Sequence, residues 1–224
     1  MHIKICGLTR PEDIAVAVEA GVDSLGFNFY PKSPRYLSTE LARDLIQAVP
    51  SHVRRVGLFV DSPRESVLAI CRSVGLEIAQ TYPDPTSEPV DLEEIVSWPA
   101  FRVKDVETLT QIRGYLDRAR DLGRLPPAVL LDSYVAGVMG GSGHTAPWDL
   151  IAGFDPGVPI ILAGGLTPET VATAIRTVQP WGVDVASGVE SAPGRKDPDR
   201  VRSLIRAVHS VCNDAASRKL TPHP

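Results

Sequence analysis

The feature of this sequence that most restricts its fold is a regular alternation of short apolar runs with longer segments of helical periodicity. Parallel strands need a crossover connection, usually a helix, so this alternation predicts right-handed βαβ units and a parallel sheet. The expected strands are residues 2–6, 24–28, 55–60, 76–80, 101–103, 128–132, 158–163 and 183–187. Eight parallel strands are the number that closes a barrel. We therefore predict an α/β fold, a single (βα)8 TIM barrel with an eight-stranded parallel sheet.

Capping signals mark several of the expected helix starts. The segments TRPE (9–12) and SPRE (62–65) have the spacing of capping boxes, in which a hydroxyl and a Glu satisfy free backbone N–H groups. Thr167 and Asp197 each precede a proline, which is favoured at the first helical position. Strand, short loop and capped helix thus follow one another along the chain.

Length and composition favour one globular domain. The chain has 224 residues, of which 43% are hydrophobic and 22% are charged, and a single (βα)8 barrel accommodates that length. No flexible linker divides it. Periodicity is lost near the C-terminal end, so we predict a barrel domain over residues 1–212 and a disordered tail over 213–224.

Charge and hydropathy exclude two classes of partner. The formal net charge is −4 and no long Lys/Arg run is present, so we expect no nucleic acid partner. No apolar stretch approaches the roughly 18 residues of a membrane span, and no signal sequence is visible at the N-terminus. We expect a cytoplasmic protein without a membrane partner.

The three cysteines support neither a disulfide framework nor a metal site, because their number is odd and their spacing fits no metal motif. Cys71 and Cys212 lie on apolar stripes with helical spacing and are expected in the core. Cys6 instead ends the first expected strand, where it shares a face with Lys4. Either a buried core thiol or a reactive thiol is consistent with this position.

The carboxyl ends of the strands are where a barrel of this kind carries its active site. Asp132 closes the run AVLLD, and desolvation at an apolar barrel mouth raises a carboxyl pKa toward the range of a general acid. A structural Asp that caps the following turn fits the same position. Arg35, in the loop YPKSPRYLS, offers a planar fork for an anionic group of a ligand.

Small residues follow the last expected strands. The segments LAGGLTPET (162–170) and ASGVE (186–190) lie after strands seven and eight, where barrels commonly build a phosphate site from backbone N–H groups. The segment GGSG (140–143) offers a further wall, with His144 beside it as a possible ligand contact. Ordinary tight turns also use glycine, and that alternative stays open.

Taken together, the motifs KICGLTRPED, LGFNFYPKSPRYLS, VGLFVD, GGSGHTAPWDLI, ILAGGLTPETV and GVDVASGVESAPGRKD resemble the phosphoribosylanthranilate isomerase family of tryptophan biosynthesis. The resemblance extends from Lys4 to about Val208. It implies a (βα)8 barrel and an intramolecular oxidoreductase without metal or organic cofactor. The implied reaction is the Amadori rearrangement of N-(5-phosphoribosyl)anthranilate to 1-(2-carboxyphenylamino)-1-deoxyribulose 5-phosphate.

The resemblance also implies roles for individual residues. Cys6 matches the general base of the family and Asp132 the general acid. A thiolate serves as that base only if its pKa is depressed. Arg35 looks like the contact to the anthranilate side of the substrate. The expected phosphate-binding residues are Gly164, Gly165, Ser187 and Gly188.

Two features of the resemblance leave alternatives. Asp184 matches an Asp near the ligand, but an inward Lys4 also needs a buried partner, and strand eight is next to strand one. After strand four the family pattern Q-L-H-G is replaced by QTYP (80–83). Tyr82 then supplies the lost polar contact to the substrate, or turnover is weaker, or the substrate differs.

The implied partner is a small phosphorylated molecule, bound by a monomer or a homodimer. The alternatives are another phosphosugar-barrel enzyme, or a degenerate and weakly active paralogue that binds a phosphate ligand.

Overall fold

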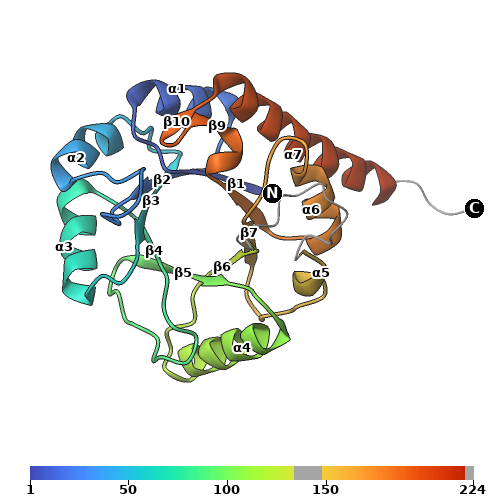
Figure 1. Ribbon diagram of the computed structural model, residues 1–224. Helices are drawn as coiled ribbons and strands as arrows, with labels where there is room; N and C mark the ends of the chain where they lie inside the picture. Colours follow the sequence, from blue (N-terminus) through green and yellow to red (C-terminus); the bar gives the residue numbers. More distant parts are fainter. Residues whose placement is uncertain (134–147, 220–224) are drawn as a thin grey trace, which may run out of the picture.

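The computed structural model of the protein describes residues 1–133 and 148–219, with side chains to residue 213. Eight parallel strands close into a barrel in chain order, as the alternating pattern predicted, and helices surround it (Figure 1). The strands are β1 (His2–Cys6), β2 (Ser24–Asn28), β3 (Arg54–Phe59), β4 (Ile78–Thr81), β5 (Val96–Arg102), β6 (Val129–Asp132), β7 (Ile160–Ala163) and β8 (Gly182–Val185).

The outer layer consists of helices that follow most of the strands. These are α1 (Pro11–Ala20), α2 (Thr39–Gln47), α3 (Arg64–Val74), α4 (Val106–Asp121), α5 (Trp148–Ile151), α6 (Val171–Val178) and α7 (Pro198–Lys219). Residues 82–95, between β4 and β5, contain no helix. After β8 the chain adds a 3₁₀ turn, η1 (Ser187–Val189), and a small antiparallel pair, β9 (Glu190–Ala192) and β10 (Arg195–Lys196), which lies over the β1 side of the barrel (Figure 1).

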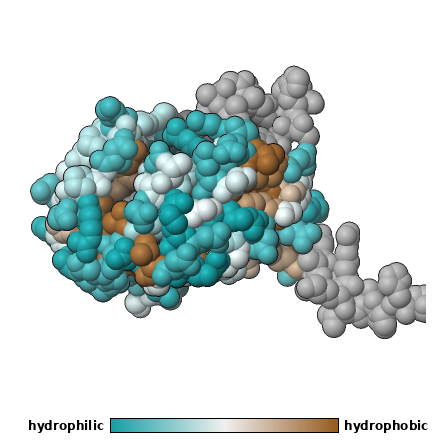
Figure 2. Space-filling view, turned by 90° about the horizontal axis from the view of Figure 1, so that it is seen from below, coloured by the Kyte–Doolittle hydropathy of each residue, from teal (hydrophilic) through white to brown (hydrophobic). Residues whose placement is uncertain are grey.

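Strand residues alternate between two apolar layers. Ile3 and Ile5 belong to the large cluster between sheet and helices, whereas Trp98, Leu130 and Ile161 belong to a smaller cluster inside the barrel. Because side chains alternate along a strand, Lys4 and Cys6 face the barrel interior, as predicted. The face in Figure 2 is largely hydrophilic, with small separate apolar patches, because the helices cover the main cluster.

Two of the predicted helix caps are wrong. The N-caps of α1 and α3 are Arg10 and Pro63, and neither forms a side-chain cap. The Thr9 hydroxyl donates to the Gly194 carbonyl, and the Ser62 hydroxyl donates to the Val60 carbonyl. Both hydroxyls bind acceptors outside the helix, so the capping geometry is lost.

The other two caps differ from each other. Asp197 accepts hydrogen bonds from the backbone N–H groups of Asp199 and Arg200 at 2.9 Å, which confirms it as the cap of α7. Helix α6 begins at Val171 with Thr170 at the N-cap, so the predicted start at Pro168 is wrong, and residues 168–170 form a turn instead. The Thr167 hydroxyl still accepts a hydrogen bond from the Glu169 N–H at 3.2 Å, which is the contact expected of a cap residue.

Two strands and the C-terminal end also differ from expectation. β5 begins at Val96 rather than at residue 101, although Pro99 within it lacks an N–H. β8 ends at Val185, because Ser187 already belongs to η1. Helix α7 reaches Lys219, beyond the expected end of the barrel domain at Cys212, and residues 220–224 lie outside the described part.

Candidate functional site

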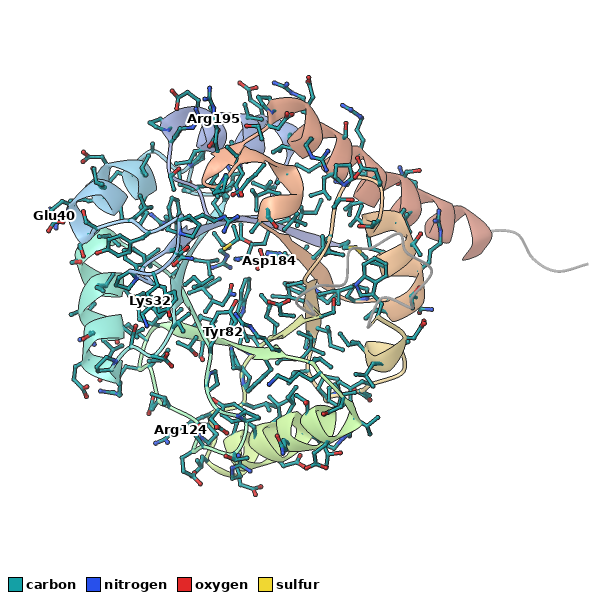
Figure 3. All side chains as sticks on the ribbon, viewed as in Figure 1. Lys32, Glu40, Tyr82, Arg124, Asp184 and Arg195 are labelled. Carbon is teal, nitrogen blue, oxygen red and sulfur yellow. The ribbon has the colours of Figure 1, made fainter. Side chains whose placement is uncertain are left out.

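One cavity at the carboxyl ends of the strands collects nearly all of the predicted site residues. It has a volume of about 170 Å³, and its lining includes Cys6, Tyr82, Asp132, Gly164, Gly165, Asp184, Ser187 and Gly188. These residues come from the ends of β1, β4, β6, β7 and β8 or from the loops that follow. Figure 3 shows Tyr82 and Asp184 pointing into the barrel from its two sides. Of the predicted set, only Arg35 lies outside this lining.

A buried ion pair forms the floor beside Cys6. Lys4 Nζ lies 2.8 Å from Asp184 Oδ1, and the two side chains are 0% and 8% exposed. Asp184 therefore has the buried pairing with Lys4 that the sequence offered as one of its two roles, and it also lines the cavity; its contact with a substrate stays a prediction. The adjoining residue of β2 is Gly26, whose Cβ as an alanine would lie 2.6 Å from Cys6 Sγ and 3.1 Å from Lys4 Nζ. Only glycine leaves room for the thiol and the ammonium here, a requirement that the sequence analysis missed.

The surroundings of Cys6 do not depress the pKa of its thiol. Burial raises the pKa of Cys6 above its usual value, and the nearby Lys4 ammonium opposes that effect without cancelling it. Burial alone would lower the pKa of Lys4, but the charge of Asp184 outweighs it and raises that pKa. The described residues alone therefore do not provide the depressed pKa that a thiolate base requires.

A second buried network holds Arg35 beside Cys6. The Arg35 Nε and Nη2 atoms donate to the two carboxylate oxygens of Glu190 at 2.8 and 2.6 Å. Lys196 Nζ donates to Glu190 at 2.8 Å, and also to the carbonyls of Cys6 at 2.6 Å and Ala186 at 3.1 Å. The β9–β10 pair thus contacts both the end of β1 and the loop after β2.

Gly7 is needed for the same packing. Its φ is +78°, and a Cβ there would lie 2.4 Å from Arg35 Cδ. The absence of a side chain lets the stem of Arg35 lie directly over the residue that follows Cys6.

The loops after β7 and β8 approach each other closely at the phosphate end of the cavity. Gly164 and Gly165 have φ values of +90° and +65°, which glycine adopts without strain. A Cβ on Gly188 would lie 1.8 Å from the carbonyl oxygen of Leu166, so only glycine fits there. Positive-φ glycines and a tight backbone crossing are typical of loops that aim N–H groups at an anion. The segment 140–143 and His144, also named from the sequence, lie outside the described residues.

Tyr82 stands where the family pattern has a histidine. Its hydroxyl accepts a hydrogen bond from Gln80 Nε2 at 3.1 Å, and Gln80 itself is fully buried. Burial raises the pKa of Tyr82, and the nearby Cys6, Asp184 and Asp132 raise it further, so the phenol stays neutral and keeps its proton.

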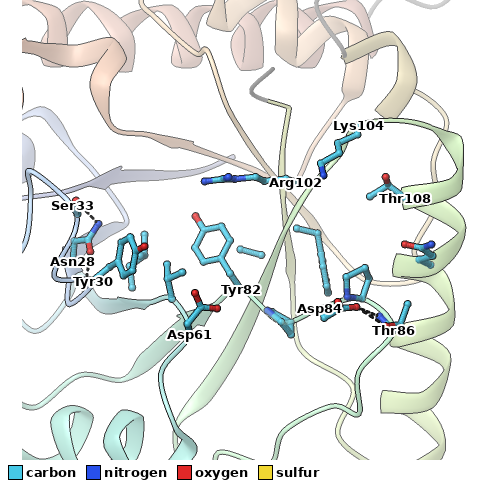
Figure 4. Close-up of a pocket in the computed structure, with 17 residues that line it drawn as sticks. Asn28, Tyr30, Ser33, Asp61, Tyr82, Asp84, Thr86, Arg102, Lys104 and Thr108 are labelled. Atoms are coloured by element: carbon cyan, nitrogen blue, oxygen red, sulfur yellow. Dashed lines mark hydrogen bonds between the residues drawn. The ribbon is translucent and has the colours of Figure 1, made fainter. Parts of the chain in front are cut away.

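A larger cavity, of about 950 Å³, adjoins the first one and shares Leu58 and Tyr82 with it. Figure 4 shows the Tyr82 ring in its middle, with Arg102 and Lys104 from the end of β5 on one side and Tyr30 on the other. Sequence reasoning missed Arg102, because the expected three-residue strand did not indicate which side of β5 faces inward. The strand register carries that signal, since Arg102 pairs with Asp132.

The described residues contain no group of three or more His, Cys, Asp or Glu side chains arranged to hold a metal ion. Among the helices of this described part, none is long and apolar enough to cross a membrane.

Comparisons with known proteins agree with this geometry. Residues 3–207 match the family described as N-(5'phosphoribosyl)anthranilate (PRA) isomerase. The chain is 45% identical over 206 residues to the N-(5'-phosphoribosyl)anthranilate isomerase of Geobacter sulfurreducens, which covers 92% of this chain and 97% of that protein. It is 41% identical over 212 residues to the enzyme of the same name from Myxococcus xanthus, with 94% of this chain and 97% of that protein covered.

Solved structures give the same result. The phosphoribosyl anthranilate isomerase of Thermotoga maritima superimposes with a TM-score of 0.81 and 36% identity, over 94% of this chain and 99% of the other. A phosphoribosyl anthranilate isomerase in complex with reduced 1-(o-carboxyphenylamino)-1-deoxyribulose 5-phosphate superimposes with a TM-score of 0.79 and 35% identity, at the same coverage. The chain belongs to the N-(5'-phosphoribosyl)anthranilate isomerase family.

Proposed function

We propose that this chain performs the reaction of its family with the residues of the smaller cavity. The substrate is N-(5'-phosphoribosyl)anthranilate, and the product is 1-(2-carboxyphenylamino)-1-deoxyribulose 5-phosphate, in tryptophan biosynthesis. The observation that carries the proposal is that one cavity joins Cys6, Asp132 and two glycine loops suited to a phosphate. The enzyme is an intramolecular oxidoreductase, because C1 of the sugar is reduced while C2 is oxidised.

The phosphate end fixes the direction of the substrate in the cavity. The backbone N–H groups of the loops that contain Gly164, Gly165, Ser187 and Gly188 bind the phosphate, and η1 adds a short helical turn at the same place. This leaves the ribose between Cys6 and Asp132, which lie on strands β1 and β6 of the barrel.

Ring opening comes first in the proposed mechanism. Asp132 gives its proton to the furanose ring oxygen as the bond from C1 to that oxygen breaks. The lone pair of the anilino nitrogen forms a protonated Schiff base with C1. The cation that results makes the proton on C2 acidic, which is the condition for the next step.

The positive charge of the Schiff base lowers the pKa of the Cys6 thiol, which loses its proton to solvent. The Cys6 thiolate then removes the C2 proton, and the electron pair moves into a C1–C2 double bond to form an enolamine. Loss of the C2 hydroxyl proton and protonation of C1 give the aminoketone product. The Lys4 ammonium, held by Asp184, stabilises the thiolate while it exists. Lys4 acts through Cys6 and is a positioning residue.

Arg35 and Tyr82 complete the substrate site in this proposal. Arg35 presents the face of its guanidinium to the anthranilate ring, since Glu190 occupies its edge. The Tyr82 hydroxyl donates its proton to an oxygen of the bound substrate, because the neutral phenol is the stable form there. The enzyme works in the cytoplasm as a monomer or homodimer, without a metal or organic cofactor.

A fluorescence assay that follows the loss of phosphoribosylanthranilate tests the proposal. We expect turnover by the wild-type protein and a loss of at least a hundredfold in kcat for Cys6→Ser and for Asp132→Asn, in line with the usual size of a general acid–base contribution. Cys71→Ser is the matched control, because Cys71 is buried in α3 outside the site. Near-normal kcat in either site variant would remove the assigned role. A wild-type protein that binds the reduced product analogue without turnover would favour a degenerate paralogue.

A further inference from the structure

The reaction cavity is too small for the whole substrate. At about 170 Å³ it falls below the roughly 300–1,000 Å³ typical of ligand pockets, whereas the adjoining cavity has about 950 Å³. The substrate also has two anionic ends, a phosphate on the sugar and a carboxylate on the aromatic ring. With the phosphate at the β7 and β8 loops, the aromatic end extends past the shared residues Leu58 and Tyr82 into the larger cavity.

Strand register places Arg102 at the entrance to that larger cavity. Ala100 pairs with Leu130 and Arg102 pairs with Asp132, and residues that pair in a parallel ladder lie on the same side of the sheet. Ala100 and Leu130 belong to the apolar cluster inside the barrel, so Arg102 projects inward one layer above them. Figure 4 shows its side chain extended across the mouth of the barrel, beside the Tyr82 ring.

The lining of the larger cavity includes two cations, Arg102 and Lys104, and two carboxylates, Asp61 and Asp84. Arg102 is favoured over Lys104 as the partner of an anion because the strand register directs it inward, whereas Lys104 follows the end of β5. Asp84 already accepts hydrogen bonds from the backbone N–H and the hydroxyl of Thr86. Among the described residues Arg102 has no ion-pair partner, so its guanidinium fork is available for a ligand.

Arg35 differs from Arg102 in this respect. Both carboxylate oxygens of Glu190 bind the Nε and Nη2 edge of Arg35, which is the edge that takes a carboxylate in a bidentate pair. A second carboxylate on that guanidinium would lie beside the charge of Glu190. The two arginines therefore have different tasks at the aromatic end of the substrate.

We propose that Arg102 binds the carboxylate of the anthranilate group and so selects substrates that carry it. This inference rests on the proposed function. Arg102 fixes the aromatic end in the larger cavity, while Arg35 contacts the ring face and the β7 and β8 loops bind the phosphate. Arg102 contacts the carboxylate and none of the reacting atoms, so its effect falls on binding and orientation rather than on proton transfer.

The test compares two ligands by calorimetry: reduced 1-(o-carboxyphenylamino)-1-deoxyribulose 5-phosphate, and the analogue that lacks only the carboxyl group. We expect the wild-type protein to bind the carboxylated ligand at least tenfold more tightly, about 1.4 kcal/mol. In Arg102→Gln this preference falls to less than twofold, while affinity for the ligand without the carboxyl group stays unchanged. Arg43→Gln, an exposed arginine on α2, keeps the wild-type preference.

Other outcomes overturn the proposal. If Arg102→Gln keeps the full preference, another residue binds the carboxylate. If it weakens both ligands equally, Arg102 has a structural role or binds the phosphate. In either case, the proposed function still holds if the wild-type protein turns over phosphoribosylanthranilate. A wild-type protein that neither turns over this substrate nor binds either ligand contradicts both proposals.

Discussion

Removal of the Glu190 charge tests the buried network beside Cys6. The Glu190 side chain is 4% exposed, and its carboxylate faces Lys196, which is 1% exposed, and Arg35, which is 20% exposed. In Glu190→Gln the Lys196 ammonium stays buried without a carboxylate, and breaking such a pair costs about 3–5 kcal/mol. Lys196 keeps two backbone carbonyls and Arg35 is partly hydrated, so we expect the low end, about 3 kcal/mol. For a chain of this size that corresponds to a fall in Tm of roughly 6–12 °C.

Urea denaturation at pH 7 measures the loss, and a surface pair supplies the control. Glu169 lies 3.4 Å from Arg200, but its side chain is 67% exposed, so Glu169→Gln is expected to cost less than about 1 kcal/mol. The reasoning would be refuted by a cost for Glu190→Gln that does not exceed the cost of this control. Isomerase activity at 25 °C, measured on the folded fraction, then shows how the loss of the Glu190–Arg35 ion pair affects turnover.

The pH dependence of the same variant gives a second check. Burial alone would raise the pKa of Glu190, but the hydrogen bonds from Arg35 and Lys196 outweigh it and hold the pKa below 4.5. A carboxyl with a depressed folded pKa stabilises the protein above its unfolded pKa and loses that contribution as the pH falls. The stability difference between wild type and Glu190→Gln is therefore constant above about pH 5 and narrows below about pH 4. A difference that widens in acid would contradict the ion-pair interpretation.

Two further predictions follow from the residues that line the reaction cavity. Burial raises the pKa of Cys6, so we expect the rate of alkylation of Cys6, followed by mass spectrometry, to increase continuously up to pH 9. The rate is slower still in Lys4→Met, because the Lys4 ammonium lowers the pKa of the thiol. A rate that levels off below pH 8 would disprove this. Gly188→Ala places a Cβ 1.8 Å from the Leu166 carbonyl oxygen and separates the two phosphate-binding loops, so we expect the affinity for the reduced product analogue to fall at least tenfold. The control is Gly114→Ala within α4, which leaves this affinity unchanged and stabilises the protein by up to about 1 kcal/mol. Equal affinities of the two glycine variants for the analogue would contradict the inference that the close approach of the two loops shapes the phosphate site.

Patterns that depend on strand alternation were predictable from the sequence, because burial enforces them residue by residue. Alternation placed Lys4 and Cys6 on the inner face, and the glycine positions after β7 and β8 indicated the loops that line the cavity. The hydroxyl of Thr9 was misread, since the acceptor that it found lies in a segment far along the chain. Local spacing alone contains no information about such an acceptor.

Neither the β9–β10 pair nor the start of β5 could be predicted from the sequence, and the reasons differ. Strands of three and two residues are too short to show periodicity, so the contacts of Glu190 and Lys196 stayed hidden. Pro99 within β5 argued against a longer strand, and the orientation of Arg102 was lost with it. The orientation of Arg102 follows once β5 is aligned with β6, because Arg102 pairs with Asp132, which the sequence already placed at the end of β6.

The arrangement of charges around Cys6 explains why the pKa of its thiol is raised, although the proposed mechanism uses it as a base. Lys4, Lys196 and Arg35 lie near it, but Asp184 balances Lys4, and Lys196 and Arg35 share the single charge of Glu190. The positive charge that remains does not outweigh desolvation of the thiol, and a bound phosphate dianion adds negative charge. In the proposed mechanism the substrate supplies further positive charge, because the protonated Schiff base that forms when Asp132 opens the ring lies next to the thiol. Proton removal from C2 is therefore expected only after ring opening, and a substrate analogue that cannot open its ring should not exchange its C2 hydrogen with deuterated solvent.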